Sequence, residues 1–437
     1  METLISPHKI NVFWFRRDLR LEDNSALNIA LSYGLPVLPV FIFDTNILGE
    51  LPFDDARVSF IHETLIYIND KLTVYGSSLL VKKGDPAVIW QELIQSLDIN
   101  SVFINKDYEP YAIERDERVE KILGERGISL FRTKDQVILE EKEVLKADGT
   151  PYTVFTPFRN KWMQQFEKEI KRPPYSEKTN ESGFFRFTFT FPSLRDIGFT
   201  KSSVKVRPYD LTTIKEYDKY RDLPADDKTS YLSPHLRFGT ISIRQLINIA
   251  EKENITFLSE LIWREFFMQI LFNYPRVVTE SFKKKYDNIQ WRNDEKEFLK
   301  WCAGETGYPM VDAGMRQLNE TGYMHNRVRM VTASFLVKHL LIDWRWGEAY
   351  FAQKLLDYEL SSNNGNWQWA AGTGCDAAPY FRVFNPETQL QKFDPKAIYV
   401  KRWVPEFDSF GYCLPIVEHS FARNRAIAVY KTALHEK

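Results

Sequence analysis

The stretch VFWFRRDLRLEDNSALNIALSYGLPVLPVFIF (residues 12–43) contains two apolar runs, at 12–15 and 37–43, on either side of an amphipathic segment. Short buried strands that alternate with helices are typical of a parallel sheet with helices on both faces. The alternation continues to residue 135, so residues 1–135 are predicted to form a doubly wound α/β domain. Its further strands are expected at 79–81, 101–104 and 129–131, and its helices at 25–32, 57–72, 86–97 and 113–123.

The loop after the first predicted strand has the sequence FRRDLRLED and contains no glycine. Ligands of parallel sheets bind beyond the carboxyl ends of the strands, which here are followed by loops 16–24 and 44–54. A dinucleotide site of the usual kind needs a glycine-rich turn that lets the backbone approach the phosphates. Such a site is therefore not expected in this domain.

The rest of the chain follows a different pattern. Residues 136–205 are polar and interrupted by proline, as in KRPPYSEKTNESGFF (171–185), and are predicted to be a long interdomain connector. From residue 206 to 437 strand signals nearly vanish, and apolar residues recur at helical spacing in segments such as 257–272 and 326–344. The fold class is therefore α/β plus all-α, with a helical C-terminal domain.

Composition limits the classes of function. The chain has 437 residues, 44% of them hydrophobic, and a net charge of -1, so a disordered chain is excluded and any DNA contact requires a local basic patch. Three scattered cysteines fit a reducing compartment, and no secretory signal or bilayer-spanning run is visible. We expect a cytoplasmic, monomeric protein without a membrane segment and without a bound metal.

Two glycine- or hydroxyl-containing segments have alternative interpretations. In TSYLSPHLRFGTIS (229–242), Ser233 followed by Pro234 predicts a helix N-cap; the hydroxyls could bind a phosphate, although an ordinary helix start is the favoured interpretation. The segment GTGCDA (372–377) matches the pattern G-x-G-x-x-A, but no strand precedes it, so it is predicted to be a turn.

The segments that favour a ligand lie in the helical domain. LLDYELSSNNGNWQW (355–369) combines carboxylates, amides and indoles that suit a planar ligand, or equally a capped junction over an aromatic core. Arg329, on a helix predicted over 324–344, could pair with Asp357 if the two segments meet. Glu260 and Trp263 share a helical face, where a carboxylate and an indole could bind a polar heteroaromatic ring, although a core helix is the simpler interpretation.

Tryptophan is concentrated late in the chain, with eight of its eleven residues after position 260. Indoles are oxidised readily, so Trp residues that line up toward a redox cofactor could relay an electron. Without a cofactor, packing is the favoured explanation.

Taken together, these segments resemble the photolyase/cryptochrome family, and most closely class I cyclobutane pyrimidine dimer DNA photolyases. The resemblance rests on VFWFRRDLRLEDN (12–24), TSYLSPHLRFGTIS, ELIWREFF (260–267), residues 306–345 and NNGNWQWAAGTGCDAAPYFRVFNP (363–386). It spans nearly the whole chain and is weakest over 136–205. It implies an antenna-binding α/β domain joined to a helical domain that holds FAD, whose reduced anionic form is active.

The resemblance also implies residue roles. Asn363 would face N5 of the flavin, whereas Phe257 and Glu359 depart from the residues that many relatives have at these positions. The implied cofactor-binding residues are Tyr217, Thr229, Ser230, Tyr231, Leu232, Ser233, Phe257, Arg264, Arg329, Asp357, Glu359 and Asn363. The implied electron relay is Trp367, Trp344 and Trp291, in that order outward from the flavin, and this cofactor context reverses the packing interpretation of these tryptophans.

The implied substrate is ultraviolet-damaged DNA, with the pyrimidine dimer flipped out of the duplex, as photolyases are described to do. Trp263 and Trp369 would wall the dimer, Met330 would pack against it, and Asn326 and Glu260 would hydrogen-bond its edges. Glu260 is expected to be protonated so that it can donate a hydrogen bond. The implied phosphate contacts are Arg221, Arg327 and Arg382.

Two questions stay open. A cryptochrome that signals without repair, or a photolyase acting on (6-4) products, is the alternative function, and Asn363 and Trp369 favour dimer repair. Tyr108-Glu109 resembles the folate-binding loop of some relatives, which makes methenyltetrahydrofolate the first expectation for the antenna. A deazaflavin, a second flavin or no antenna remain alternatives, and Glu109 could equally be a solvated loop carboxylate.

Overall fold

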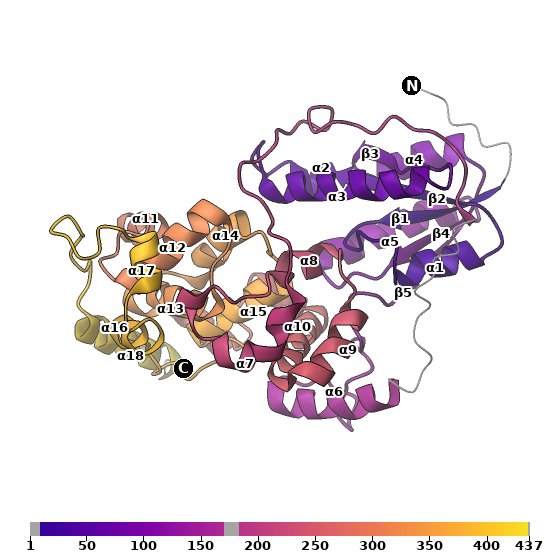
Figure 1. The fold of residues 1–437 in the computed structure, drawn as a ribbon. Coiled ribbons are helices and arrows are strands. Elements are labelled where there is room, and N and C mark those ends of the chain that lie inside the picture. The colour runs from indigo at the N-terminus through magenta and orange to yellow at the C-terminus, as the bar shows by residue number, and fades with distance from the viewer. Residues whose placement is uncertain (1–8, 170–182, 436–437) are drawn as a thin grey trace. The chain divides into compact units, whose positions relative to one another are not determined.

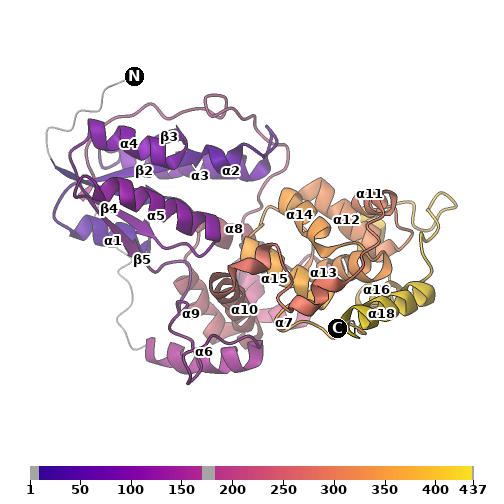
Figure 2. The same cartoon turned by 180° about the vertical axis from the view of Figure 1, so that it is seen from behind.

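A computed structural model describes residues 9–169 and 183–435 of the chain. The helices and strands form two compact units, which Figures 1 and 2 show from opposite sides. Of the described residues, the first unit comprises 9–143, 162–169, 183–207 and 232–249, and the second comprises 144–161, 208–231 and 250–435.

The first unit is built on a five-stranded sheet of order β3-β2-β1-β4-β5, in which every neighbouring pair is parallel. The predicted α/β fold class is therefore confirmed. The strands are β1 (Ile10–Phe15), β2 (Val37–Asp44), β3 (Leu80–Gly84), β4 (Ile99–Asn105) and β5 (Ser129–Thr133). The helices that alternate with them are α1 (Ser25–Ser32), α2 (Thr45–Leu48), α3 (Ala56–Thr73), α4 (Pro86–Ser96) and α5 (Pro110–Gly124).

Strand β1 shows why the sheet is apolar on both faces. Successive side chains of a strand point to opposite faces. Phe13 and Phe15 pack in one buried cluster with side chains of α1 and α3, whereas Val12 and Trp14 pack in another with side chains of α4 and α5. Both faces exclude water, so residues 12–15 of the strand form a continuous apolar run, and this run is the signal that the sequence displays.

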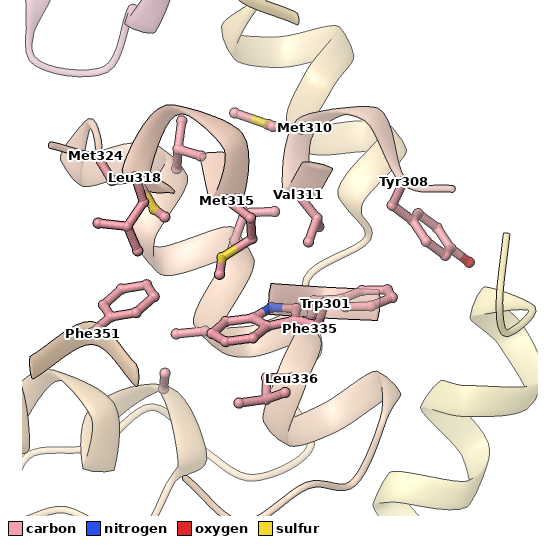
Figure 3. Packing of buried hydrophobic residues seen from close by; sticks show 14 of the residues in the cluster. Trp301, Tyr308, Met310, Val311, Met315, Leu318, Met324, Phe335, Leu336 and Phe351 are labelled. Carbon is pink, nitrogen blue, oxygen red and sulfur yellow. The ribbon is translucent and has the colours of Figure 1, made fainter. Parts of the chain in front are cut away.

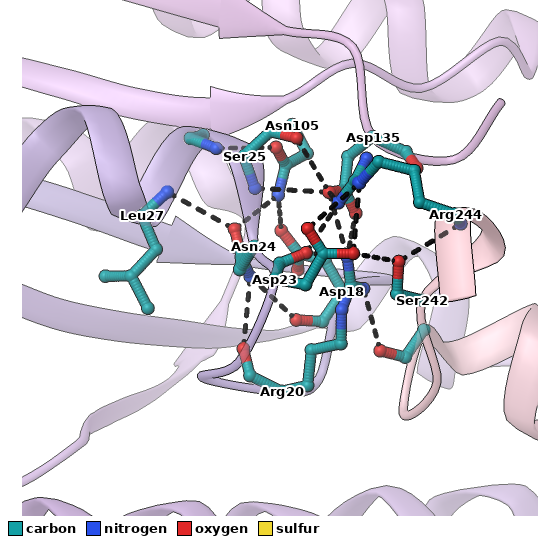
Figure 4. A network of polar contacts seen from close by, with 12 residues as sticks. Asp18, Arg20, Asp23, Asn24, Ser25, Leu27, Asn105, Asp135, Ser242 and Arg244 are labelled. Atoms are coloured by element: carbon teal, nitrogen blue, oxygen red, sulfur yellow. Dashed lines mark hydrogen bonds and ion pairs between the residues drawn. The ribbon is translucent and has the colours of Figure 1, made fainter. Parts of the chain in front are cut away.

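Within the first unit, a polar network joins residues 232–249 to the loops that follow the strands of the sheet (Figure 4). Arg244 donates to Asp23 at 3.0 Å and to Asp135 at 2.8 Å. Burial alone would raise the pKa of Asp135, but the guanidiniums of Arg20 and Arg244 outweigh it and hold that pKa below its ordinary value. The observed units therefore differ from the contiguous division at 135 and 205, because ion pairs between distant segments cannot be seen in local sequence patterns.

Among the described residues after Thr133 the regular elements are helices joined by loops, and apart from isolated bridges none of these residues lies in a strand. The helices are α6 (Phe155–Glu169), α7 (Tyr217–Tyr220), α8 (Leu232–Phe238), α9 (Ile243–Glu253), α10 (Ile255–Asn273), α11 (Glu295–Ala303), α12 (Pro309–Thr321), α13 (Asn326–Ser334), α14 (Trp344–Lys354), α15 (Leu360–Ala371), α16 (Pro386–Phe393), α17 (Ile398–Trp403) and α18 (His419–His435). Short 3-10 turns are η2 (Leu211–Glu216), η3 (Pro224–Asp226), η4 (Pro275–Val278) and η5 (Lys284–Asn288). The predicted connector thus contains a helix, α6, while residues 170–182 lie outside the described part.

The core of the second unit combines aromatic rings with aliphatic and methionine side chains (Figure 3). Trp301 is fully buried, and its indole N–H donates to the backbone oxygen of Thr332 at 3.1 Å. Its ring stacks on that of Phe351 with centroids 5.9 Å apart. A buried indole with a hydrogen-bond partner is a large and well-oriented packing unit, so part of the late tryptophan content is explained by the core.

The single helix predicted over 324–344 is wrong. Helix α13 continues into a π-helical turn, η6 (Phe335–His339), and the chain then leaves the helix with Leu341 at a φ of 52°. Asp343 begins the next helix by accepting the N–H of Arg345 at 3.0 Å. The apolar periodicity of this stretch is nearly continuous, because the residues between the helices are buried in the same core.

Candidate functional site

Helix α10 presents Glu260 beside residues of the preceding segment. Arg221 donates to Glu260 at 2.7 Å, and its guanidinium lies 5.2 Å from the ring centre of Tyr217. That ring in turn meets Phe257 edge to face, with centroids 5.1 Å apart. Residues predicted separately for the cofactor and for DNA are thus neighbours, and Arg221, expected at a phosphate, is paired with a carboxylate.

The protonation state of Glu260 reflects two opposing influences. Burial raises the pKa of its carboxyl group above the ordinary value, and the neighbouring Arg221 pulls that pKa downward without cancelling the effect. The raised pKa agrees in direction with the predicted protonated carboxyl.

Trp263 lies one turn further along α10 and is enclosed by phenylalanines. Phe155, the first residue of α6, stacks on the indole with centroids 3.6 Å apart and planes within 8°. Phe267 packs against the same indole at 5.4 Å. Within the described residues the rings of Trp263 and Trp369 make no contact with each other. Sequence reasoning missed Phe155, because it lies more than a hundred residues away in the predicted connector.

Arg329 and Asp357 form a two-point ion pair. The guanidinium donates to the two carboxylate oxygens at 3.2 Å and 2.8 Å, and its Nε donates to the backbone oxygen of Met324 at 2.8 Å. The expected pairing is confirmed. A planar fork held in this way keeps a fixed orientation, so α13 and the segment that precedes α15 present one rigid charged pair.

Helix α15 supplies the amide of Asn363. Its Nδ2 donates to the side-chain oxygen of Glu348 at 2.8 Å and to the backbone oxygen of the same residue at 3.1 Å. Because both bonds hold the nitrogen end of the amide at Glu348, the amide oxygen of Asn363 points away from Glu348. Burial raises the pKa of the Glu348 carboxyl, while the bond from Asn363 opposes the rise. Sequence reasoning did not identify Glu348, which lies on α14.

Glu359 ends the segment before α15. Its carboxylate is buried and lies 3.6 Å from the guanidinium of Arg264, and it accepts the hydroxyl of Ser362 at 3.1 Å. Two residues that were predicted for the cofactor are therefore brought together, across α10 and α15.

The three tryptophans of the predicted relay lie in or against the same core. Trp367 and Trp344 are buried, and the partly buried Trp291 packs against their cluster. At Gly347, one turn after Trp344 in α14, the indole of Trp367 packs against the helix where a side chain would otherwise lie. Trp301, which the sequence did not single out, lies 6.1 Å from Trp367 between ring centroids. The order of electron transfer stays a prediction.

The predicted DNA-side residues have different surroundings. Asn326 is exposed at the start of α13, and Arg382 is exposed in the loop after α15. Arg327 donates to Asp222 at 2.7 Å and approaches the sulfur of Met330 at 3.7 Å. The phosphate role of Arg327 would therefore have to compete with an existing ion pair.

Residues 229–233 do not form the predicted helix start. Helix α8 begins at Leu232, so Ser233 is inside its first turn and is not the N-cap. The preceding residue, Tyr231, has a φ of 53°, and its hydroxyl donates to Asp227. Proline is tolerated in a first turn without any capping serine, which is why the Ser-Pro pair was misleading. The predicted turn at 372–377 is confirmed, since Gly372 ends α15 with a φ of 85°.

Glu109 in the first unit is already engaged by protein. It accepts hydrogen bonds from Arg17 at 2.9 Å and from Arg237 at 3.1 Å. The solvated-loop interpretation of this carboxylate is therefore wrong, because two guanidiniums neutralise it. The assignment of Glu109 to an antenna stays a prediction.

Within residues 9–169 and 183–435, no three His, Cys, Asp or Glu side chains are grouped as a metal site would require. No described helix has the length and apolar character needed to cross a lipid bilayer.

Comparison with known proteins places these features in a family. Residues 11–175 match the family model described as DNA photolyase, and residues 257–411 match the model described as the FAD binding domain of DNA photolyase. The chain is 37% identical to a deoxyribodipyrimidine photo-lyase of Halobacterium salinarum, over 97% of this chain and 99% of that protein. The chain belongs to the DNA photolyase family.

Other photolyases and a cryptochrome share both sequence and fold with this family member. A deoxyribodipyrimidine photo-lyase of Escherichia coli is 36% identical, with 97% of this chain and 98% of that protein covered. The crystal structure of a Sulfolobus tokodaii photolyase with two FAD molecules superposes with a TM-score of 0.84, at 37% identity, 97% coverage of this chain and 100% of that one. A Synechocystis cryptochrome superposes at 0.83 with 26% identity, covering 97% and 99% of the two chains.

The FAD-binding domain of this photolyase-family chain contains most of the site described above. It spans α10, the Arg329–Asp357 pair and the amide of Asn363. A flavin ring offers N–H and carbonyl groups along its edge, and a fixed guanidinium, carboxylate and amide oxygen are partners for such groups. The residues present therefore fit the cofactor, and the chain binds FAD.

Proposed function

We propose that this protein repairs cyclobutane pyrimidine dimers in DNA with light, using reduced FAD. The main support is that one compact unit contains the Glu260 carboxyl group with its raised pKa, the partly buried indole of Trp263 and the polar groups that suit a flavin. When bound, reduced FAD would supply light-driven one-electron chemistry, and the residues named below would hold the cofactor and the dimer.

The cofactor is held by residues of the second unit. Arg329 and Asp357 present a guanidinium and a carboxylate in fixed orientation, and Asn363 presents its amide oxygen because Glu348 holds the nitrogen end. Arg264 on α10 and Glu359, which directly precedes α15, form a second and largely buried ion pair. Further contacts to the cofactor come from Tyr217, Thr229, Ser230, Tyr231 and Phe257.

On the DNA side, Glu260 acts as a hydrogen-bond donor. A protonated carboxyl can donate to a carbonyl of the dimer, and this bond strengthens as negative charge develops there. Trp263 and Trp369 stack against the dimer, Met330 packs on it and Asn326 contacts its polar edge. Extruding a base costs a few kcal/mol and costs least at a damaged step, which favours lesions over intact DNA.

Phosphate contacts depend on local positive charge, since the chain as a whole has a net charge of -1. Arg382 is the best candidate, because it is exposed, whereas Arg221 already donates to Glu260 and Arg327 to Asp222. Electrons reach the cofactor from the surface through Trp291, Trp344 and Trp367. Methenyltetrahydrofolate in the first unit is the proposed antenna, with a second flavin as the alternative that the Sulfolobus tokodaii structure brings forward.

The decisive experiment is an illuminated repair assay on duplexes that contain either a cyclobutane dimer or a (6-4) product. We expect repair of the dimer only, and a lower quantum yield for Glu260→Ala than for the matched control Glu253→Ala, an exposed glutamate on α9. If the flavin-loaded protein repairs neither lesion, it is a cryptochrome-type signalling protein. If Glu260→Ala repairs with unchanged quantum yield, the proposed role of Glu260 is wrong.

A further inference from the structure

The contact between Phe155 and Trp263 is the closest ring stack on α10. The two ring centroids are 3.6 Å apart and the planes are inclined by only 8°. Phe155 is 7% exposed, so this contact lies within the packed interior of the second unit. One face of the indole is therefore covered by protein, and any ligand must use the remaining exposed surface of the ring.

Phe155 is itself held by a third segment. Its backbone N–H donates to a carboxylate oxygen of Asp376 at 2.9 Å. The first N–H groups of a helix have no partner within the helix, and here the partner comes from the loop between α15 and α16. The same loop exposes Phe381, at 58%, and Arg382. A single residue thus joins the start of α6, the middle of α10 and an exposed basic and aromatic loop.

We propose that Phe155 is a positioning residue for lesion recognition, which sets the plane of the Trp263 indole and ties that plane, through Asp376, to the loop of Phe381 and Arg382. This inference rests on the proposed function, in which Trp263 contacts the dimer and the loop contacts the surrounding DNA. The affinity that an extruded base gains from stacking on an aromatic ring is greatest when that ring is already held in the plane of the stack. A mobile indole would have to be ordered on binding, at the cost of affinity.

Helix α6 offers a matched control. Phe158 lies one turn after Phe155, is fully buried, and packs on Phe266 with centroids 5.2 Å apart. Its ring contacts do not include Trp263. Replacing Phe158 by leucine therefore tests the packing of α6 in general, whereas replacing Phe155 by leucine also removes the stack on the indole.

The experiment uses the full-length, flavin-loaded protein and two labelled duplexes, one with a single cyclobutane thymine dimer and one intact. We expect Phe155→Leu to raise the Kd for the dimer duplex about tenfold, the range of one lost base–aromatic contact, with the Kd for intact duplex unchanged. Phe158→Leu should lower Tm but leave the ratio of the two Kd values as in the wild type. Phe155→Tyr, which keeps the ring, and Asp376→Asn, which keeps an acceptor, should retain most of the selectivity.

Trp263→Ala separates this inference from the proposed function. If Trp263→Ala leaves lesion affinity unchanged, the assignment of Trp263 to the dimer fails. If Trp263→Ala weakens lesion binding but Phe155→Leu does not, or if Phe158→Leu has the same effect as Phe155→Leu, the positioning role of Phe155 is refuted. Adding Phe155→Leu to Trp263→Ala should cause no further loss, and an additive loss would also refute the proposal.

Discussion

Substituting Gly347 by alanine should uncouple photoreduction from repair. A methyl group at this position would lie 2.1 Å from Cη2 of the Trp367 indole and 2.6 Å from a methyl carbon of Leu336. Ordinary contact begins at 3.4 Å, so the indole has to retreat by about 1.3 Å or tilt. Overpacking of this kind costs about 1–3 kcal/mol, which corresponds to a Tm lower by roughly 3–10 °C for a unit of this size.

The assay follows the reduction of bound, oxidised FAD under blue light with a thiol as the external reductant. We expect slower photoreduction in Gly347→Ala, because electron tunnelling falls steeply with distance, while protein reduced chemically with dithionite still repairs dimers. Gly365→Ala is the matched control, since its methyl group would also meet a ring at 2.1 Å, but the ring is that of Phe267. If Gly347→Ala lowers Tm but its flavin is photoreduced at the wild-type rate, the relay through Trp367 is refuted.

Three further outcomes follow from the site. Asp357→Ala leaves the guanidinium of Arg329 without its carboxylate partner, so the purified protein should hold less FAD per chain. A ratio of flavin absorbance to protein absorbance equal to that of the wild type would contradict this expectation. Glu260→Gln should have a higher free energy of unfolding than the wild type at neutral pH, because burial raises the folded-state pKa of Glu260 and the wild type loses stability as pH rises through that pKa. The difference between the two proteins should vanish below about pH 4.5, where the carboxyl group is protonated in both the folded and the unfolded state. Denaturant unfolding measured across this pH range tests the sign of the difference. Glu348→Ala removes the acceptor that orients Asn363 and should shift the absorption bands of bound flavin, whereas Glu348→Gln should shift them less; identical spectra would exclude the orienting role.

Local periodicity accounted for what the sequence predicted correctly. The strands around Phe13 and Phe41 are apolar on both faces, and the helices between them are amphipathic, so the α/β unit could be predicted without tertiary information. The placement of Glu260 and Trp263 on one face of α10 follows from helical spacing alone. Each of these properties depends only on neighbours within a few residues.

The predictions that the structure corrects depend on contacts between segments that are distant in the chain. The break after His339, the location of Ser233 within α8 and the attachment of residues 232–249 through Arg244 all depend on which distant groups satisfy a backbone or a charge. The sequence leaves Glu109 open between an antenna residue and a solvated loop carboxylate, because its partners Arg17 and Arg237 are distant in the chain.

The sequence by itself therefore determined the sheet, the helical domain and the family to which the segments belong. Only the tertiary structure decided that Phe155 stacks on Trp263, that Glu348 orients Asn363 and that Arg221 pairs with Glu260. The physical reason is range: hydrogen bonding within a helix or a strand is set by residues a few positions apart. A ring stack or ion pair between separate segments forms only after packing has brought the segments together.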